Sequence, residues 1–160
     1  MNLDQDSGAF TEIRHHSSSV GRNTLHLCFK AKYCHKIFED NQVEKRCAEI
    51  FEEAARDHMW ILREIGFDTD HVHIIIEAGT NGPMDVAKAL KGRSGRKLLK
   101  EFPYLKRKYF WGSGLWSPAY YFDKIGERTI TEMERYVQNQ GNSKKRKVRM
   151  GQSTLQDFAC

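Results

Sequence analysis

The stretch Asp70-His71-Val72-His73-Ile74-Ile75-Ile76 decides the fold of this 160-residue chain. It alternates polar and apolar residues and then becomes fully apolar, which predicts a buried central β-strand. Because successive side chains of a strand point to opposite faces, His71 and His73 share one face. Their backbones lie about 7 Å apart, from two rises of about 3.3 Å each, so both imidazoles can bind one divalent ion. The strand alone leaves open the alternative of two half-buried histidines with only local hydrogen bonds.

The segments on either side predict the rest of an α+β fold. Capping boxes are predicted at Asn41 with Glu44 and at Thr129 with Glu132. The expected elements are a strand over 25–34, a helix from Asn41 to about Asp57, a strand over 60–67, the histidine strand, a helix from Pro83 to Phe102, a strand through Leu115-Trp116 and Tyr120-Tyr121-Phe122, and a helix from Thr129 to Gln140. This order predicts a ferredoxin-like split βαβ arrangement, also found in RNA-recognition domains. A four-stranded antiparallel sheet then carries helices on one face. The other face is left open, and the last helix has no place in these layers.

The length predicts one domain with polar extensions. Residues 1–22 are polar with little periodicity, which predicts a mobile N-terminal arm. The domain is expected over 23–141. Residues 142–160, which include Lys144-Lys145-Arg146-Lys147, are expected to form a basic tail.

The net charge of +5, with a pI near 9.0, favours a polyanionic partner. The sequence contains no secretory signal and no apolar run of about 18 residues, so we expect a cytoplasmic protein without a membrane span. The four cysteines form no C-x-x-C pair, and we interpret them as reduced thiols rather than zinc ligands.

The last predicted helix adds a phenol and an amide to the two histidines. Tyr136 and Gln140 are four residues apart, so they share a helix face. By themselves they are compatible with a boundary aromatic and a solvated end residue. With His71 and His73, however, Gln140 completes a three-ligand site with open positions, which suits Mg²⁺ or Mn²⁺. Such an ion polarises a phosphate that the Tyr136 phenol can attack, and the phosphotyrosine ester keeps the bond energy for a later reversal by a 3′-hydroxyl.

An ordered set of four segments extends this pattern over roughly residues 23–141. The set is Asp70-His71-Val72-His73, Leu90-Lys91-Gly92-Arg93-Ser94, Leu115-Trp116-Ser117 with Tyr120, and Tyr136-Val137-Gln138-Asn139-Gln140. In content and order it resembles the single-tyrosine HUH (His-hydrophobic-His) transposases, which mobilise hairpin-ended insertion sequences as single strands. Relaxases and rolling-circle initiators often carry two tyrosines on this helix. The single Tyr136 favours the transposase branch.

The resemblance implies a role for each residue of the site. His71 and His73 are implied as metal ligands, Gln140 as the third ligand, and Tyr136 as the nucleophile, with Mg²⁺ (or Mn²⁺) as the cofactor. The implied activity is cleavage and rejoining of single-stranded DNA at insertion-sequence ends through a 5′-phosphotyrosine intermediate. In this family the tyrosine helix of one subunit completes the site of the other, which implies a homodimer with a shared active site.

Basic residues supply a candidate surface for single-stranded DNA hairpins. Arg93, Arg96 and Lys97 lie on the second predicted helix, and Lys30 and Lys32 lie on the first strand. Nearby aromatic residues would stack bases beside the phosphates that these cations contact. A solvated cationic face is the alternative interpretation.

Other functions remain open from the sequence. A histidine-triad hydrolase would need a third histidine at position 75, where Ile75 stands. A non-catalytic nucleic-acid binding module of the same topology would place aromatics on the exposed face of the central strands, where this chain has His71 and His73. A domesticated nuclease that processes palindromes would share every residue named above.

Overall fold

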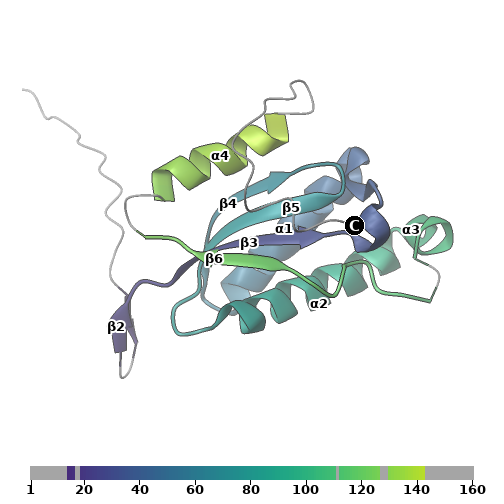
Figure 1. Ribbon diagram of the computed structural model, residues 1–160. Coiled ribbons are helices and arrows are strands. Elements are labelled where there is room, and N and C mark those ends of the chain that lie inside the picture. The colour runs from purple at the N-terminus through teal and green to yellow at the C-terminus, as the bar shows by residue number, and fades with distance from the viewer. Residues whose placement is uncertain (1–13, 17–18, 111, 127–129, 143–160) are drawn as a thin grey trace, which may run out of the picture.

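The computed structural model describes residues 14–16, 19–110, 112–126 and 130–142, and it confirms the predicted α+β fold (Figure 1). Its main sheet is antiparallel, with the strand order β4-β5-β3-β6. This is the order of a ferredoxin-like split βαβ unit. The strands are β3 (Thr24–Lys30), β4 (Ile61–Phe67), β5 (His71–Glu77) and β6 (Tyr121–Lys124).

Helices cover both faces of this sheet. Figure 1 shows α1 (Asn41–Asp57) and α2 (Pro83–Glu101) on one side of the strands and α4 (Ile130–Asn142) on the other. The main core lies between the sheet and the α1–α2 layer. Its buried side chains include Leu25, Leu27, Phe29, Val72, Ile74, Ile76, Val43, Ile50, Leu90 and Leu98.

Local sequence explains where the helices of this layer begin. Asp40 is the N-cap of α1, one residue before the predicted cap, because its side chain accepts a hydrogen bond from the backbone N–H of Gln42 (2.9 Å). Pro83 begins α2 as predicted, since its fixed φ and missing N–H suit a first helical position. The predicted four-residue stripe of α2 (Val86, Leu90, Ser94 and Leu98) is buried.

The first main strand is shorter than the sequence predicts. β3 ends at Lys30, and a 3₁₀ turn, η1 (Lys32–Cys34), follows it. Tyr33 and Cys34 both have positive φ, so the chain turns sharply where the alternating pattern predicts four more strand residues. Tyr33, predicted on the core face, is therefore 67% exposed.

The second half of the chain differs from the prediction at three places. Pro103 ends α2 but also begins a short helix, α3 (Pro103–Lys108), which was not predicted. Trp116 forms an isolated bridge with Ala31 rather than part of a strand, and β6 begins only at Tyr121. α4 continues past Gln140 to Asn142, and its predicted cap Thr129 lies outside the described residues.

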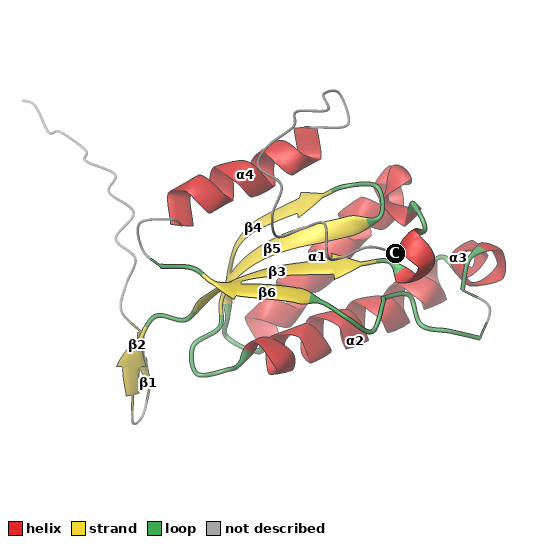
Figure 2. Ribbon diagram, in the orientation of Figure 1, coloured by secondary structure: helices red, strands yellow, loops and turns green. Residues whose placement is uncertain are grey.

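The polar N-terminal region contains an unpredicted hairpin. Strands β1 (Arg14–His16) and β2 (Ser19–Gly21) pair with each other, and Figure 2 shows them apart from the main sheet. The rest of the predicted arm before residue 14, and the predicted tail beyond residue 142, lie outside the described residues.

The largest difference concerns the sheet face that was expected to be open. In the structure α4 of the same chain packs over β4 and β5 on this face. His26 and Cys28 of β3, predicted on a polar face, are both buried. Cys28 and Cys47 are free thiols, but Cys34 is part of a disulfide, so the interpretation of all four cysteines as reduced is wrong for Cys34. Among the described helices, none has the length and apolar character of a membrane span.

Candidate active site

The two central strands bring the histidines together on the face that α4 covers. His71 and His73 lie on β5, and their ring centroids are 5.1 Å apart. The register of β3 places Cys28 directly opposite His73 and Lys30 directly opposite His71. Since directly opposed residues of an antiparallel pair project from the same face, the site is flanked by a thiol and a cation. Burial raises the pKa of the Cys28 thiol to about 12, so this side chain stays neutral.

α4 brings the tyrosine to this pair. The Tyr136 ring meets the His73 ring edge-on, with the two centroids 5.8 Å apart. The structure therefore joins three of the four residues that the sequence selected, from segments more than 60 positions apart. The fourth, Gln140, lies one helical turn beyond Tyr136 in α4, and its side chain is outside the described residues.

A glycine in β4 allows α4 to approach so closely. Gly66 is the strand partner of His73, and a Cβ atom built on it would lie 2.1 Å from the backbone oxygen of Val137. Any side chain at this position would therefore occupy the space of the α4 backbone. Val137, the residue next to Tyr136, is fully buried in this contact. We call the contact of Gly66 with Val137 the α4 seat.

Polar contacts on β4 hold the same helix in place. Arg63 forms an ion pair with the buried Glu77 of β5 (3.0 Å) and another with Glu134 of α4 (3.8 Å). Gln138 of α4 donates a hydrogen bond to Glu64 (2.9 Å). β4 contains a register shift between Leu62 and Glu64, so its regular pairing is interrupted beside these contacts.

The electrostatic environment favours a neutral His73, and Asp70 orients His71. Burial lowers the pKa of His73 well below its usual value, and His71 and His26 strengthen the effect. The hydrogen bond with His71 lowers the pKa of Asp70, so Asp70 is ionised and can only accept. Asp70 Oδ1 lies 2.6 Å from His71 Nδ1. His71 Nδ1 therefore donates this bond, which leaves Nε2 as the nitrogen of His71 that could bind a cation.

The donor set fits a divalent cation with open positions. His73 Nε2 is buried and has no hydrogen-bond partner in the structure. A buried polar atom without a partner is unusual in a protein, and it is expected where the atom binds a ligand such as a metal ion. With His71 Nε2, His73 Nε2 supplies two nitrogen ligands. Within the described ranges, no group of three or more His, Cys, Asp or Glu side chains could hold a metal.

His26 is the residue that sequence reasoning missed. It is buried on β3, and its Nε2 lies 3.0 Å from His73 Nδ1. Burial lowers the pKa of His26, and the charge of Asp123 on β6 partly offsets this. The signal was present, because His26 alternates with Leu25 and Leu27, but it predicted only a polar face. Its pairing with His73 depends on the strand register.

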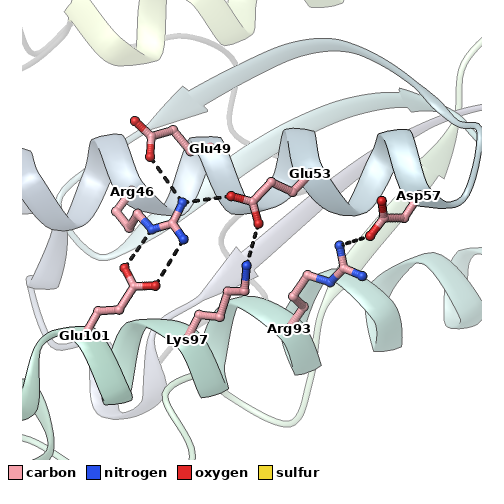
Figure 3. Close-up of polar contacts among 7 residues, drawn as sticks. All are labelled: Arg46, Glu49, Glu53, Asp57, Arg93, Lys97 and Glu101. Carbon is pink, nitrogen blue, oxygen red and sulfur yellow. Dashed lines mark hydrogen bonds and ion pairs between the residues drawn. The ribbon is translucent and has the colours of Figure 1, made fainter.

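The candidate DNA-binding residues fall into two groups. Arg93 and Lys97 of α2 form ion pairs with Asp57 (2.6 Å) and Glu53 (2.5 Å) of α1, as Figure 3 shows. In contrast, Arg96 is exposed, Lys30 lies opposite His71, and Lys32 has its ammonium 5.5 Å from the Tyr33 ring centroid.

The ion pairs of α1 and α2 form one network. The Arg46 guanidinium binds Glu49, Glu53 and Glu101, and Lys97 also binds Glu53 (Figure 3). Hydrogen bonds from Lys97 and Arg46 lower the pKa of Glu53 to about 2. Arg93 and Lys97 are thus paired with carboxylates of α1 within the helix layer, on the side of the sheet opposite to Tyr136.

Comparisons with known proteins identify relatives of this arrangement. The family model "Transposase IS200 like" matches residues 19–140. The ISDra2 transposase TnpA of Deinococcus radiodurans is 30% identical over 116 residues, which make up 72% of this chain and 81% of that protein. A crystal structure of a candidate transposase from D. radiodurans R1 has a TM-score of 0.63 at 29% identity, covering 80% of this chain and 98% of the other. A REP-associated tyrosine transposase bound to a REP hairpin has a TM-score of 0.55 at 14% identity, covering 84% and 73% of the two chains, and shows a likeness of fold alone.

Proposed function

This chain belongs to the family of IS200-like transposases, and from this premise we propose that it cleaves and rejoins single-stranded DNA at insertion-sequence ends, with Tyr136 as the nucleophile. Membership of the family implies DNA cleavage and strand transfer. The observation that carries the finer proposal is the Tyr136 ring at 5.8 Å from the ring of His73. A phenol beside two imidazoles is the arrangement that a metal-assisted attack on phosphate requires.

The proposed reaction is a pair of transesterifications. The Tyr136 phenol loses its proton and its oxygen attacks the scissile phosphorus, so that a 5′-phosphotyrosine bond forms and the 3′-oxygen leaves and takes up a proton. A 3′-hydroxyl of a second strand then attacks the same phosphorus and releases the tyrosine. One phosphoester replaces another in each step, so no external energy source is needed.

His71, His73 and Gln140 would hold a divalent cation, Mg²⁺ or Mn²⁺, which stabilises negative charge on the phosphate when it is bound. Asp70 orients His71 through their 2.6 Å contact. α4, held on its seat at Gly66, orients Tyr136. The chain itself thus positions the nucleophile and the ligand nitrogens, and the burial of His73 excludes water from one side of the site.

Covalent capture tests the nucleophile. Wild-type protein incubated with a labelled single-stranded hairpin and Mg²⁺ should give an adduct that survives denaturing electrophoresis, and Tyr136→Phe should give none. Tyr121→Phe is the matched control, because this phenol lies 5.8 Å from the His26 ring on the same sheet but outside α4. An adduct with Tyr136→Phe, or its loss with Tyr121→Phe alone, would refute the assignment.

We propose single-stranded DNA hairpins as the substrate, acted on in the cytoplasm. A fold relative has been solved with a REP hairpin, and the chain has a net charge of +5. The proposed phosphate contacts are Lys30, which lies beside His71, the exposed Arg96, and the half-buried Lys32. Arg93 and Lys97 could contribute only by leaving their ion pairs with α1.

We also propose a homodimer in which the two copies exchange α4, so that each α4 seat receives the helix of the partner. The resemblance to the HUH transposases supports this exchange, whereas in the structure α4 lies on its own sheet. Mixing His73→Ala chains with Tyr136→Phe chains tests it. If helices are exchanged, a mixed dimer has one site with both residues intact and forms an adduct. If each chain keeps its own helix, the mixture stays inactive.

The position of α4 argues against a non-catalytic module that binds nucleic acid on its open sheet face. Such a module exposes the face of its central strands to the bases. Here His26 and His73 of this face are buried, and Tyr136 of α4 lies against His73. A domesticated nuclease that processes palindromes would use the same residues. A gene that is not flanked by the ends of a mobile element would identify the protein as such a nuclease.

A further inference from the structure

His26 forms a buried contact with one of the proposed metal ligands. Its ring stacks on the ring of His73, with centroids 5.2 Å apart and planes 18° from parallel. His26 Nε2 lies 3.0 Å from His73 Nδ1, within hydrogen-bond distance. Both residues are almost completely buried. The proposed reaction gives no part to His26, so a buried polar group beside the site has no assigned role.

The hydrogen bond between two neutral imidazoles has two possible directions. If His26 donates from Nε2, then His73 must carry its own proton on Nε2. That nitrogen is buried without a partner, and a buried N–H without an acceptor costs about 1–3 kcal/mol. If His73 donates from Nδ1 instead, its Nε2 holds a lone pair, which a cation can bind. Only the second direction makes His73 a ligand.

We propose that His26 is a positioning residue that accepts a hydrogen bond from His73 Nδ1 and so keeps the Nε2 lone pair of His73 directed at the metal position. The proposal rests on the metal site of the proposed function. Stacking fixes the plane of the His73 ring, and the hydrogen bond fixes which of its nitrogens carries the proton. Asp70 orients His71 in the same way, through the contact between Asp70 Oδ1 and His71 Nδ1. The two proposed ligands are thus oriented by different partners, a carboxylate for the partly buried His71 and an imidazole for the fully buried His73.

The first test measures the proton position without metal. In ¹⁵N-labelled wild-type protein, long-range ¹H–¹⁵N spectra should show the His73 ring with its proton on Nδ1. In His26→Leu, which has no acceptor, this preference should disappear. A His73 proton on Nε2 in the wild-type protein would overturn the proposal directly.

The second test measures Mn²⁺ affinity by calorimetry, with circular dichroism as a check of folding. His26→Leu should bind Mn²⁺ about 10–100-fold more weakly than the wild type, the range typical for loss of a residue that orients a ligand. His26→Gln should restore the affinity to within about threefold, because its amide oxygen takes the place of Nε2 and can accept the same hydrogen bond. His26→Asn should not restore the affinity, because its shorter side chain does not bring the amide oxygen to the position of Nε2. If His26→Leu fails to fold, the Mn²⁺ affinities of His26→Gln and His26→Asn are compared instead, and a higher affinity of His26→Gln supports the proposal.

The outcomes separate this inference from the proposed function. If the wild type binds Mn²⁺ and His71→Ala abolishes binding, the metal site stands, and equal affinities of the wild type, His26→Leu and His26→Asn would overturn the role of His26 alone. Equal loss in the Gln and Asn variants would likewise reduce His26 to a packing residue. If the wild type binds no Mn²⁺ at the two histidines, the metal site and the role of His26 fail together.

Discussion

Replacing Gly66 with alanine should displace α4 and slow adduct formation without unfolding the sheet. The new Cβ would lie 2.1 Å from the Val137 backbone oxygen, whereas ordinary contact begins at 3.4 Å. α4 must therefore move by about 1.3 Å, and it carries Tyr136 with it. A misplacement of about 1 Å in a reacting group can reduce the rate about 100-fold, so we expect a loss of that size in single-turnover adduct formation.

The same substitution should have a limited effect on stability. Overpacking a well-packed contact costs about 1–3 kcal/mol, and the strand itself accepts alanine, since Gly66 lies outside the positive-φ region. Urea denaturation measures this cost. Gly114→Ala is the matched control, because a Cβ there has no atom within 4 Å, and it should leave both rate and stability unchanged. If Gly66→Ala forms adduct within threefold of the wild-type rate, the α4 seat does not position Tyr136.

Three further variants probe the layers around the site. Ser94→Ala removes the buried acceptor of the Trp116 indole N–H (2.8 Å), and urea denaturation should show a loss of about 1–3 kcal/mol; no change would mean that the indole finds another acceptor. Glu53→Gln removes a carboxyl whose pKa in the folded protein, about 2, is below its ordinary 4.5, so its stabilising effect is complete above pH 4.5 and is lost as pH falls toward 2. The difference in free energy of unfolding between wild type and Glu53→Gln, measured by urea denaturation, should therefore shrink as the pH falls from 4.5 toward 2. A difference that does not change with pH would contradict this reasoning. Arg96→Ala should reduce the slope of log K for single-stranded DNA against log salt by about 0.7, whereas Arg93→Ala, which breaks an ion pair with α1, should leave the slope unchanged. A wild-type slope for Arg96→Ala would show that Arg96 binds no phosphate.

The histidine strand was predictable because its information is local. The alternation and apolar run of 70–76 determine both the strand and the shared face of His71 and His73, and the structure has both. The helix spacing of Tyr136 is equally local. The sheet order also followed, since the sequence of strands and helices permits few compact topologies.

The surroundings of the site were not predictable, because they depend on how distant segments meet. Gly66 has no pattern that distinguishes a helix seat from an ordinary strand glycine until α4 is placed over it. His26 was assigned to a polar face, and only the register with β5 makes it a partner of His73. Arg93 belonged to a basic run, and its ion pair with Asp57 requires the relative positions of α1 and α2.

The burial of His73 also limits how a metal ion could reach the proposed site. With α4 seated, this imidazole has no exposed surface, so an incoming ion cannot reach Nε2 from bulk solvent along that side. For the proposed cation, loading and release would then require α4 to move away from His73. The same motion would free Tyr136 to carry a strand away, so the residence time of the proposed ion would follow the movement of the nucleophile.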